Sequence, residues 1–293
     1  MNYELMLFDR IEFLKQTNTK LDLENNSYLA FSGGKDSLCV HYLLDMALPN
    51  NKIPRVFINT GIEYNDMVKF VKEMQKEDDR IIIVQPKRNI REMLKEVGYP
   101  ISSKQHSHNL SIYQKLGMTQ TNIQYLGMGE KQRFLCPKIL RYQFSEDFNI
   151  KCSEKCCDEL KKYPSRDYAK ENNKTISITG IRMDEGGFRQ GNSKCITYNK
   201  ATKLKMVHPL KPISDEWEEQ FILKNNIKLC KLYYPPYSFR RVGCKGCPFS
   251  LGLKEQLETM KDLLPNEYKQ CEDIWKPVYD EYRRINYRLK GMR

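Results

Sequence analysis

A short polar loop near the N-terminus combines the residue types that bind phosphate. It lies between an apolar run at 28–31 and an apolar stretch at 38–44. The run predicts a buried strand and the stretch a packed helix, so the loop is expected at a strand-to-helix turn. Adjacent glycines let the backbone approach a ligand closely, and a helix N-terminus favours an anion. We therefore expect phosphate groups to be held by Ser32, Gly33, Gly34, Lys35, Asp36 and Ser37.

The spacing of this loop differs from the P-loop of kinases and GTPases. Instead, the run SGGKDS after a strand resembles the pyrophosphate loop of the N-type ATP pyrophosphatases, including the phosphoadenosine phosphosulfate (PAPS) reductase family. The resemblance implies a site for ATP, or for an adenylyl sulfate such as APS or PAPS. With ATP it also implies Mg²⁺, for which Asp36 is a candidate ligand.

Strand-like and helix-like segments alternate through the first hundred residues. An amphipathic helix is expected over 3–17, with Leu5, Phe8, Ile11, Phe13 and Leu14 on its packed face. Strands are expected at 28–31, 55–59 and 80–85. Helices are expected to end near 46 and to cover 66–76 and 89–97. This alternation predicts an α/β fold with a parallel sheet and flanking helices. The resemblance implies the same architecture, the adenine nucleotide alpha hydrolase-like fold.

Later segments extend this pattern. A fourth strand is expected at 175–180, a hairpin at 195–208, and a helix capped by Ser214 that ends near 225. We expect an N-terminal helix at 1–24, a PAPS reductase-like nucleotide-binding domain at 25–235, and a C-x-x-C loop with helices at 236–293. Residues 98–150 show little periodicity and are expected to form a covering loop or a surface insertion. His106 and His108 could pair on a metal, but exposure to solvent is the expected outcome.

Ligands of parallel sheets bind where the strands end. The residues Asn59, Thr60 and Gly61 follow the second strand, and Gly180 begins a Gly-x-Arg segment after the fourth. The resemblance implies that both segments contact the nucleotide, with the segment at Gly180 reaching its sulfate in the reductases. Guanidinium groups match phosphate and sulfate bidentately. The expected catalytic residues are Lys35, Asp36, Arg182 and Arg189.

Ten cysteines in a chain without a recognisable export signal favour a metal site over a disulfide framework. Adjacent Cys156 and Cys157 and the C-x-x-C pair Cys244 and Cys247 could supply four thiolates to zinc or to a [4Fe–4S] cluster. The pattern CC…CxxC resembles the cluster-bearing APS reductases, which favours the cluster. Cys152 in place of one of the pair, zinc, and a redox-active disulfide remain alternatives.

The C-terminus departs from the reductases. They carry a mobile cysteine in an E-C-G-[LI]-H segment, whereas the last cysteine here, Cys271, lies in a helix-like stretch. The segment 275–293 interleaves tyrosines with arginines. We expect one helical face to pack on the protein and the other to meet a nucleic acid.

The formal net charge of +12 suits an anionic partner, and no apolar run is long enough for a membrane span. The protein is therefore expected in the cytoplasm, without a membrane partner. Expected partners are an adenine nucleotide, a nucleic acid substrate and a sulfur donor such as a cysteine desulfurase. A homo-oligomer is left open.

These features predict an adenylating ATP pyrophosphatase with a cysteine-bound cluster that acts in sulfur transfer. An APS or PAPS reductase working without the usual tail cysteine is the main alternative. A nucleotide or redox sensor without catalytic activity is the third.

Overall fold

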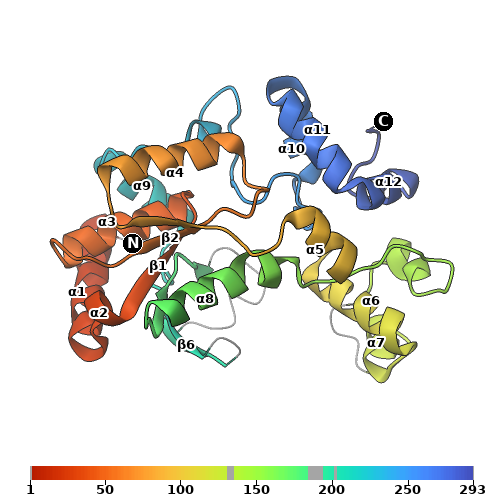
Figure 1. The fold of residues 1–293 in the computed structure, drawn as a ribbon, viewed down its shortest axis with the longest axis horizontal. Helices are drawn as coiled ribbons and strands as arrows, with labels where there is room; N and C mark the ends of the chain where they lie inside the picture. Colours follow the sequence, from red (N-terminus) through yellow and green to blue (C-terminus); the bar gives the residue numbers. More distant parts are fainter. Residues whose placement is uncertain (1, 131–134, 184–193, 201–202, 293) are drawn as a thin grey trace. The chain divides into compact units, whose positions relative to one another are not determined.

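The computed structural model describes residues 2–130, 135–183, 194–200 and 203–292 (Figure 1). The chain forms two compact units, each built from segments that are distant in sequence. The first, here called the sheet unit, comprises Met1–Asn59, Asn65–Pro86 and Lys162–Val242. The second, the cysteine unit, comprises Thr60–Tyr64, Lys87–Lys161 and Gly243–Arg293.

A six-stranded sheet forms the centre of the sheet unit, with the strand order β3-β2-β1-β4-β6-β5. All neighbouring strands are parallel except β5 and β6, which form an antiparallel hairpin. This arrangement confirms the predicted α/β fold. The strands are β1 (Ser27–Phe31), β2 (Arg55–Ile58), β3 (Ile81–Val84), β4 (Ile176–Ile178), β5 (Ile196–Asn199) and β6 (Leu204–Val207).

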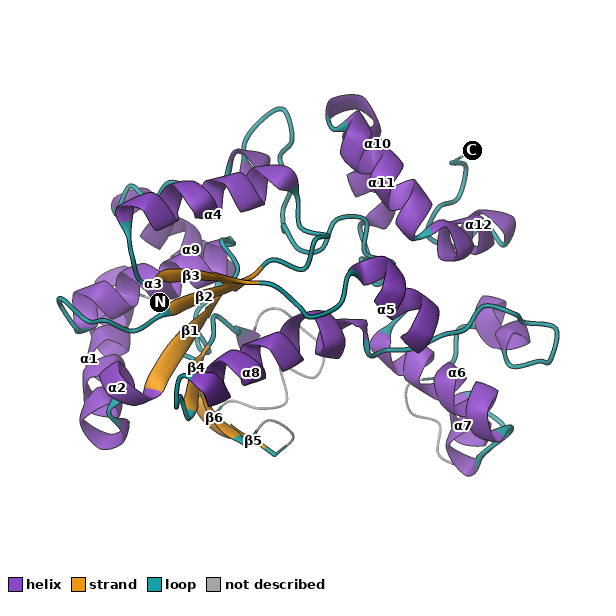
Figure 2. Ribbon diagram, in the orientation of Figure 1, coloured by secondary structure: helices purple, strands orange, loops and turns teal. Residues whose placement is uncertain are grey.

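Helices cover the sheet, and α4 and α8 lie on opposite sides of it (Figure 2). The helices of this unit are α1 (Tyr3–Leu21), α2 (Leu23–Asn26), α3 (Lys35–Ala47), α4 (Asn65–Glu77), α8 (Tyr163–Glu171), α9 (Asp215–Lys224) and the short η5 (Lys231–Tyr233). Ser214 caps α9 as predicted, because its side chain accepts a hydrogen bond from the Trp217 backbone N–H.

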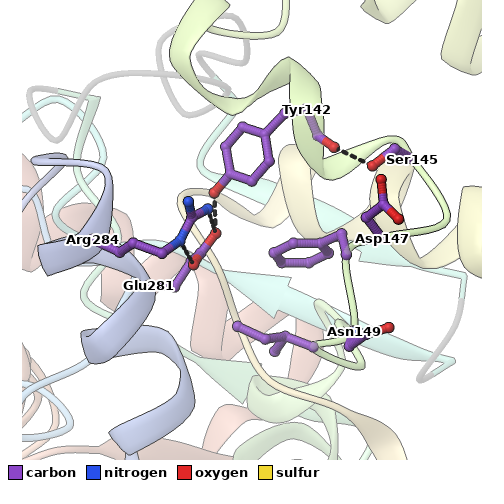
Figure 3. Close-up of a pocket in the computed structure, with 8 residues that line it drawn as sticks. Tyr142, Ser145, Asp147, Asn149, Glu281 and Arg284 are labelled. Atoms are coloured by element: carbon purple, nitrogen blue, oxygen red, sulfur yellow. Dashed lines mark hydrogen bonds and ion pairs between the residues drawn. The ribbon is translucent and has the colours of Figure 1, made fainter.

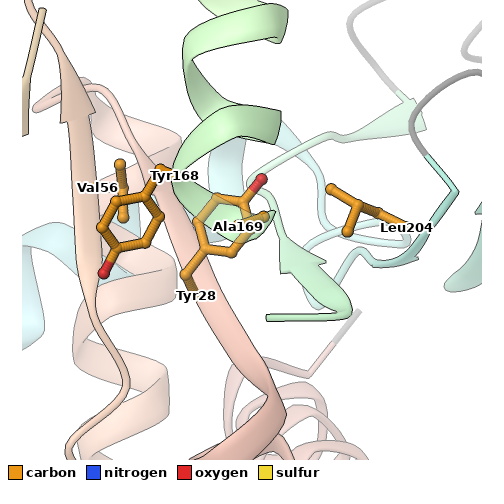
Figure 4. Close-up of a cluster of buried hydrophobic side chains, with 5 residues drawn as sticks. All are labelled: Tyr28, Val56, Tyr168, Ala169 and Leu204. Atoms are coloured by element: carbon orange, nitrogen blue, oxygen red, sulfur yellow. The ribbon is translucent and has the colours of Figure 1, made fainter. Parts of the chain in front are cut away.

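A buried apolar cluster joins α8 to the strands (Figure 4). The rings of Tyr28 and Tyr168 meet edge to face with 5.8 Å between their centroids, a favourable aromatic geometry. Burial of such large side chains provides most of the free energy that holds the helix on the sheet. The cluster consists of Tyr28, Val56, Tyr168, Ala169 and Leu204.

The packed face of α1 agrees only in part with the prediction, since Leu14 is fully buried as expected. Leu5 and Phe8 are 65% and 63% exposed, whereas Tyr3 and Met6 are buried. Tyr3 stacks on Trp217 of α9, with ring centroids 5.3 Å apart. Apolar residues occur on both faces of this helix, and contact with α9 decides which face is buried.

The cysteine unit is mostly helical in its described residues. Its elements are α5 (Ile90–Val97), α6 (Lys104–Leu116), α7 (Gln120–Tyr125), the 3₁₀ helix η1 (Lys138–Gln143), α10 (Leu253–Leu263), α11 (Pro265–Ile274) and α12 (Lys276–Arg284), together with most of the π-helix η2 (Asp158–Lys162). The expectation of a covering loop over 98–150 is therefore wrong for much of that segment, and the alternative of a surface insertion stays a prediction. Its helices begin at polar caps, Ser103 and Thr119, and are not marked by an apolar stripe.

A buried histidine explains the polar character of this segment. The side chain of His106 lies 2.7 Å from the Gln143 side-chain oxygen and 3.0 Å from the Tyr125 hydroxyl. It is fully buried, so the expectation of exposure is wrong for His106. His108 is exposed and pairs with Glu154 at 2.9 Å. The two histidines therefore have different surroundings and do not form a metal pair.

Among the described helices, none has the length and apolar character needed to span a membrane.

Burial lowers the pKa of His106 to about 4, so acid should destabilise the fold. The unfolded chain binds a proton near pH 6.5, whereas folded His106 binds it only near pH 4. The free energy of unfolding should therefore fall as the pH drops from about 6.5 towards 4, and His106 should account for roughly 2 kcal/mol at pH 5. We expect His106→Gln to reduce this pH dependence in urea unfolding at pH 7 and pH 5. The exposed His108→Gln is the matched control, and equal pH dependence in both variants would contradict the prediction.

Candidate nucleotide loop and cysteine site

The candidate phosphate loop in the sheet unit joins β1 to α3, as the sequence predicts. Gly34 is the N-cap of α3, and Gly33 has a positive φ of 71°. A Cβ atom on Gly33 would lie 2.6 Å from the Met67 sulfur and 2.8 Å from Val71. Only glycine meets both requirements, so the close packing of α4 explains this position.

The two serines of the loop hold its shape. Ser37 Oγ donates to the Gly34 carbonyl oxygen at 2.9 Å and lies 3.1 Å from Ser32 Oγ. The Gly34 backbone N–H donates to Ser32 Oγ at 3.3 Å. The loop is thus organised by its own hydrogen bonds around the N-terminus of α3.

Lys35 lies beside an aromatic ring that the sequence analysis did not identify. Its ammonium nitrogen is 5.2 Å from the ring centroid of Tyr233, within the range of a cation–π interaction. Burial raises the pKa of the Tyr233 hydroxyl, which therefore stays protonated near neutral pH. Tyr233 can restrict the directions in which the Lys35 side chain extends.

The carboxylate of Asp36 is held by Arg182, which lies 146 residues later in the chain. Arg182 Nε is 2.5 Å from Asp36 Oδ1, and the same guanidinium contacts Asp215 at 2.7 Å and Glu218 at 3.1 Å. The Arg182 side chain is only 4% exposed, whereas that of Asp36 is 35% exposed. Arg182 therefore contacts three carboxyl groups and fixes Asp36 in a position that solvent can reach.

Glu218 is the buried member of this group. Its pKa is raised to about 8, first by burial and then by the neighbouring charge of Asp36. The sequence analysis did not identify Asp215 or Glu218, since acidic residues after a Ser cap are typical of any helix start. Only the position of α9 beside Arg182 gives them a role.

Gly180 explains how the Gly-x-Arg segment approaches the loop. A Cβ atom at this position would lie 2.8 Å from Asp36 Cβ and 2.9 Å from its backbone carbonyl carbon. The absent side chain lets the end of β4 contact the first turn of α3. Arg189, predicted with Arg182, lies outside the described residues.

The segment after β2 divides between the units. The Asn59 backbone N–H donates to the Val84 carbonyl at 2.8 Å and extends the sheet. Thr60 and Gly61 belong to the cysteine unit. The Thr60 hydroxyl donates to a Glu63 carboxylate oxygen at 2.6 Å, so this threonine orients an acidic side chain.

The four predicted metal ligands lie within electrostatic range of one another in the cysteine unit. Burial raises the pKa of the Cys156 thiol, and the charges of Cys157, Cys244 and Cys247 raise it further. The pKa of Cys247 is raised to about 12, again by burial first and then by Cys244. Burial also raises the pKa of Cys244, and the charge of Lys161, a residue missed in the sequence, offsets part of that rise.

All ten cysteines are free thiols. Within the described ranges, no three Cys, His, Asp or Glu side chains stand in positions ready to coordinate a metal. Cys152 donates to the Ile150 carbonyl at 3.2 Å. Burial raises the pKa of its thiol, and Glu281 raises it further. Four thiols beside one cation are ligands of the type that bind a [4Fe–4S] cluster. Metal binding would have to deprotonate them.

The C-terminal helices support the C-x-x-C loop. Gly246 has a φ of +59°, and a Cβ atom there would lie 2.9 Å from Cys271 Sγ and would clash with the Tyr279 hydroxyl. Tyr279 donates to the Gly246 carbonyl, and Tyr282 donates to the Pro248 carbonyl at 3.0 Å. Both tyrosines are fully buried, so they cannot stack on bases as the sequence analysis suggested.

The basic residues of this region are also engaged. Lys245 is buried and pairs with Glu267 at 3.2 Å, so its charge is already used inside the cysteine unit. Arg283 pairs with Glu272. Arg288 donates to the Pro248 carbonyl at 2.6 Å. These contacts assign the C-terminal segment to the scaffold of the loop.

A separate cavity of ≈ 350 Å³ lies in the cysteine unit, between the segment after η1 and α12 (Figure 3). Its acidic residue Glu281 already accepts a hydrogen bond from Tyr142 and pairs with Arg284 at 2.7 Å. The Glu281 carboxylate is therefore already paired within the lining of the cavity.

The sheet and its loop define a nucleotide-binding α/β protein. The chain belongs to the phosphoadenosine phosphosulfate reductase domain family, whose model matches residues 26–250. This membership supports nucleotide-binding, sulfur-related chemistry.

Individual proteins are more distant. The uncharacterized protein MJ0973 of Methanocaldococcus jannaschii is 24% identical over 93% of this chain and 56% of its own length. The chain spans about half the length of the curated relatives it matches. A PAPS reductase from Candida auris in a phosphate complex has 14% identity and a TM-score of 0.45, covering 80% of this chain and 93% of that one. The U34-tRNA thiolase NcsA from Methanococcus maripaludis, solved with its [4Fe-4S] cluster, has 16% identity and a TM-score of 0.41, covering 98% and 80%.

The contact between Gly180 and Asp36 leads to a prediction. Gly180→Ala should push the end of β4 away from α3, because the new methyl group would overlap Asp36 and its backbone. We expect a loss of roughly 1–3 kcal/mol in the free energy of unfolding and weaker ATP binding. Gly243→Ala is the matched control, since a Cβ atom there meets no atom within 4 Å. If Gly180→Ala kept the wild-type thermal stability and ATP affinity, the close contact between the end of β4 and α3 would matter for neither property.

Proposed function

We propose that the protein cleaves ATP to AMP and pyrophosphate in order to activate an acceptor for sulfur transfer. Family membership and the loop at Ser32–Ser37 support the nucleotide site. The observation that carries the proposal is the grouping of four thiols from two distant segments in the cysteine unit. A nucleotide loop and a set of metal-binding thiols in one chain suit sulfur chemistry.

The loop residues have separate tasks in this proposal. The loop and the N-terminus of α3 bind the phosphates, and Lys35 supplies a cation. Asp36, fixed by Arg182 and open to solvent, is placed to bind Mg²⁺, which keeps several water molecules and needs few protein ligands. Arg182 acts mainly through Asp36, because its guanidinium already contacts three carboxylates. Arg189 is retained as a proposed partner for the developing phosphate charge.

The proposed reaction has two balanced steps. A hydroxyl or carbonyl oxygen of the acceptor attacks the α-phosphorus of ATP, the bond to the β-phosphate oxygen breaks, and pyrophosphate leaves with Mg²⁺. Hydrosulfide then attacks the activated carbon, and AMP leaves with the acceptor oxygen, so no net oxidation or reduction occurs. Sulfur from a donor such as a cysteine desulfurase arrives as a persulfide, and two electrons from a thiol reductant are then needed to release it at the sulfide level.

The acceptor is proposed to be anionic, and a nucleic acid fits the net charge of +12. Contact would come from basic surface residues rather than from Tyr279 or Tyr282, which are buried.

A [4Fe–4S] cluster held by Cys156, Cys157, Cys244 and Cys247 would supply a soft metal centre for sulfur. The cysteines would act as its thiolate ligands, and Lys161 would offset part of their negative charge. Tyr279 and Tyr282 would hold the C-x-x-C loop in place through their hydrogen bonds to the Gly246 and Pro248 carbonyls.

Reduction of an adenylyl sulfate is the second candidate, since the family is named for such a reductase. That reaction uses a mobile cysteine near the C-terminus in the related reductases. Here Cys271 is fully buried in α11, and burial raises its thiol pKa to about 12. These properties oppose a nucleophilic role for Cys271 and favour adenylation.

The nucleotide assignment is tested through the loop. We expect Lys35→Ala and Asp36→Ala to abolish Mg²⁺-dependent release of pyrophosphate from ATP, since each loses a charged contact to phosphate or metal that stabilises binding by roughly 1.5–3 kcal/mol. The control is Lys20→Ala, an exposed lysine at the end of α1 in the same unit. Full activity in both loop variants would refute the phosphate-loop assignment. Sulfite release from APS with a thiol reductant, without pyrophosphate release, would identify the reductase instead, and nucleotide binding without either activity would identify a sensor.

The metal is tested by anaerobic purification. We expect a brown protein with about four irons per chain and a broad absorption band at the short-wavelength end of the visible range. Cys244→Ser or Cys247→Ser should lose the iron. Cys136→Ser is the control, because this buried cysteine contacts His106 rather than the four thiols. A colourless protein with one zinc per chain would show that the metal assignment is wrong.

A further inference from the structure

Glu63 is a buried acid in the short segment Thr60–Tyr64 of the cysteine unit. Only 7% of the surface of Glu63 is exposed to solvent. One carboxylate oxygen, Oε2, accepts hydrogen bonds from the Thr60 backbone N–H at 2.8 Å and from the Thr60 hydroxyl at 2.6 Å. These two bonds fix the direction of the carboxylate, so the other oxygen, Oε1, has a defined target.

That target is Lys161. Its ammonium nitrogen lies 3.3 Å from Glu63 Oε1, and it is close enough to Cys244 for the two charges to interact. The Lys161 side chain is 40% exposed, so solvent offers it an alternative position. A long, flexible, strongly hydrated side chain stays beside the half-buried Cys244 thiol only if another group holds it there.

The backbone keeps Glu63 and Cys244 in register. The two residues form an antiparallel β-bridge, and the Lys245 backbone N–H donates to the Ile62 carbonyl at 2.8 Å. The carboxylate that pairs with the ammonium therefore lies on a segment that is bridged to the one carrying the Cys244 thiol.

We propose that Glu63 is a positioning residue that holds the Lys161 ammonium against Cys244 and so keeps a cation fixed at the cysteine site. The chemistry calls for such a cation, because four thiolates around a metal carry a large negative charge in a buried place. The contact between Glu63 and Lys161 does not depend on the proposed function. Only the second experiment below assumes the proposed cluster.

The first experiment measures the position of Lys161 directly. Metal-free protein is treated with acetic anhydride at fixed pH, and acetylation of each lysine is followed by peptide mass spectrometry. Glu63→Gln should release the ammonium and raise the acetylation rate of Lys161 roughly two- to fivefold, the effect expected for losing a partly exposed ion pair. Lys276, which pairs with Asp280 at 2.6 Å on α12, is the internal control and should be unchanged.

Thr60→Val separates position from charge. It removes the hydroxyl that orients Glu63 while conserving volume and every charge, and it decides the matter if Glu63→Gln does not fold. We expect a smaller rise in the acetylation rate of Lys161. An unchanged rate in the folded variants would overturn the proposal, whatever metal the protein binds.

The second experiment uses cluster-loaded protein and measures whether each substitution raises or lowers the reduction potential of the cluster. Loss of a nearby cation makes a cluster harder to reduce, so Lys161→Met should lower the reduction potential. Thr60→Val keeps both charges, so if Glu63 positions Lys161 this variant should lower the potential too, and Thr60→Val combined with Lys161→Met should match Lys161→Met. An unchanged potential in Thr60→Val would overturn the proposal, because the direction of the Glu63 carboxylate would then not affect the cation. Absence of a cluster would refute the proposed function and leave the acetylation result intact.

Discussion

The ion pair between Arg182 and Asp36 is the constraint on which the nucleotide loop depends. A carboxylate in the first turn of α3 is favoured by the helix dipole, but its direction is open until a partner fixes it. Arg182 provides that partner at 2.5 Å, and Gly180 allows the two segments to approach. Asp215 and Glu218 in turn hold Arg182, so the loop, the end of β4 and the start of α9 form one charged group.

The cysteine unit solves a different physical problem. Burial keeps thiols protonated, as the raised pKa values of Cys156 and Cys247 indicate, whereas metal binding requires thiolates. A fixed cation reduces this conflict, and Lys161 is placed to supply it. The C-terminal aromatic residues serve the same site, because Tyr279 and Tyr282 bind the carbonyls of the C-x-x-C loop.

Strong periodicity made much of the fold predictable. The apolar runs of β1 to β4 and the Gly-rich turn between β1 and α3 are local signals, so the α/β fold followed from the sequence. Residues 98–150 lacked such signals because polar side chains are buried there. His106 is covered by Tyr125 and Gln143, and neither contact has a local pattern. Helix α1 shows the same limit, since its apolar faces could be ranked only by the contact with Trp217.

By itself, the sequence determined which residues could bind phosphate and which could bind a soft metal, because those abilities depend on residue type and local spacing. The tertiary structure alone decided which side chains meet. Arg182 became a clamp for Asp36, Lys245 became a buried partner of Glu267, and Glu63 came to face Lys161 beside Cys244. The physical reason is that such pairs form between distant segments, and their energies depend on burial and distance, which only folding of the whole chain sets.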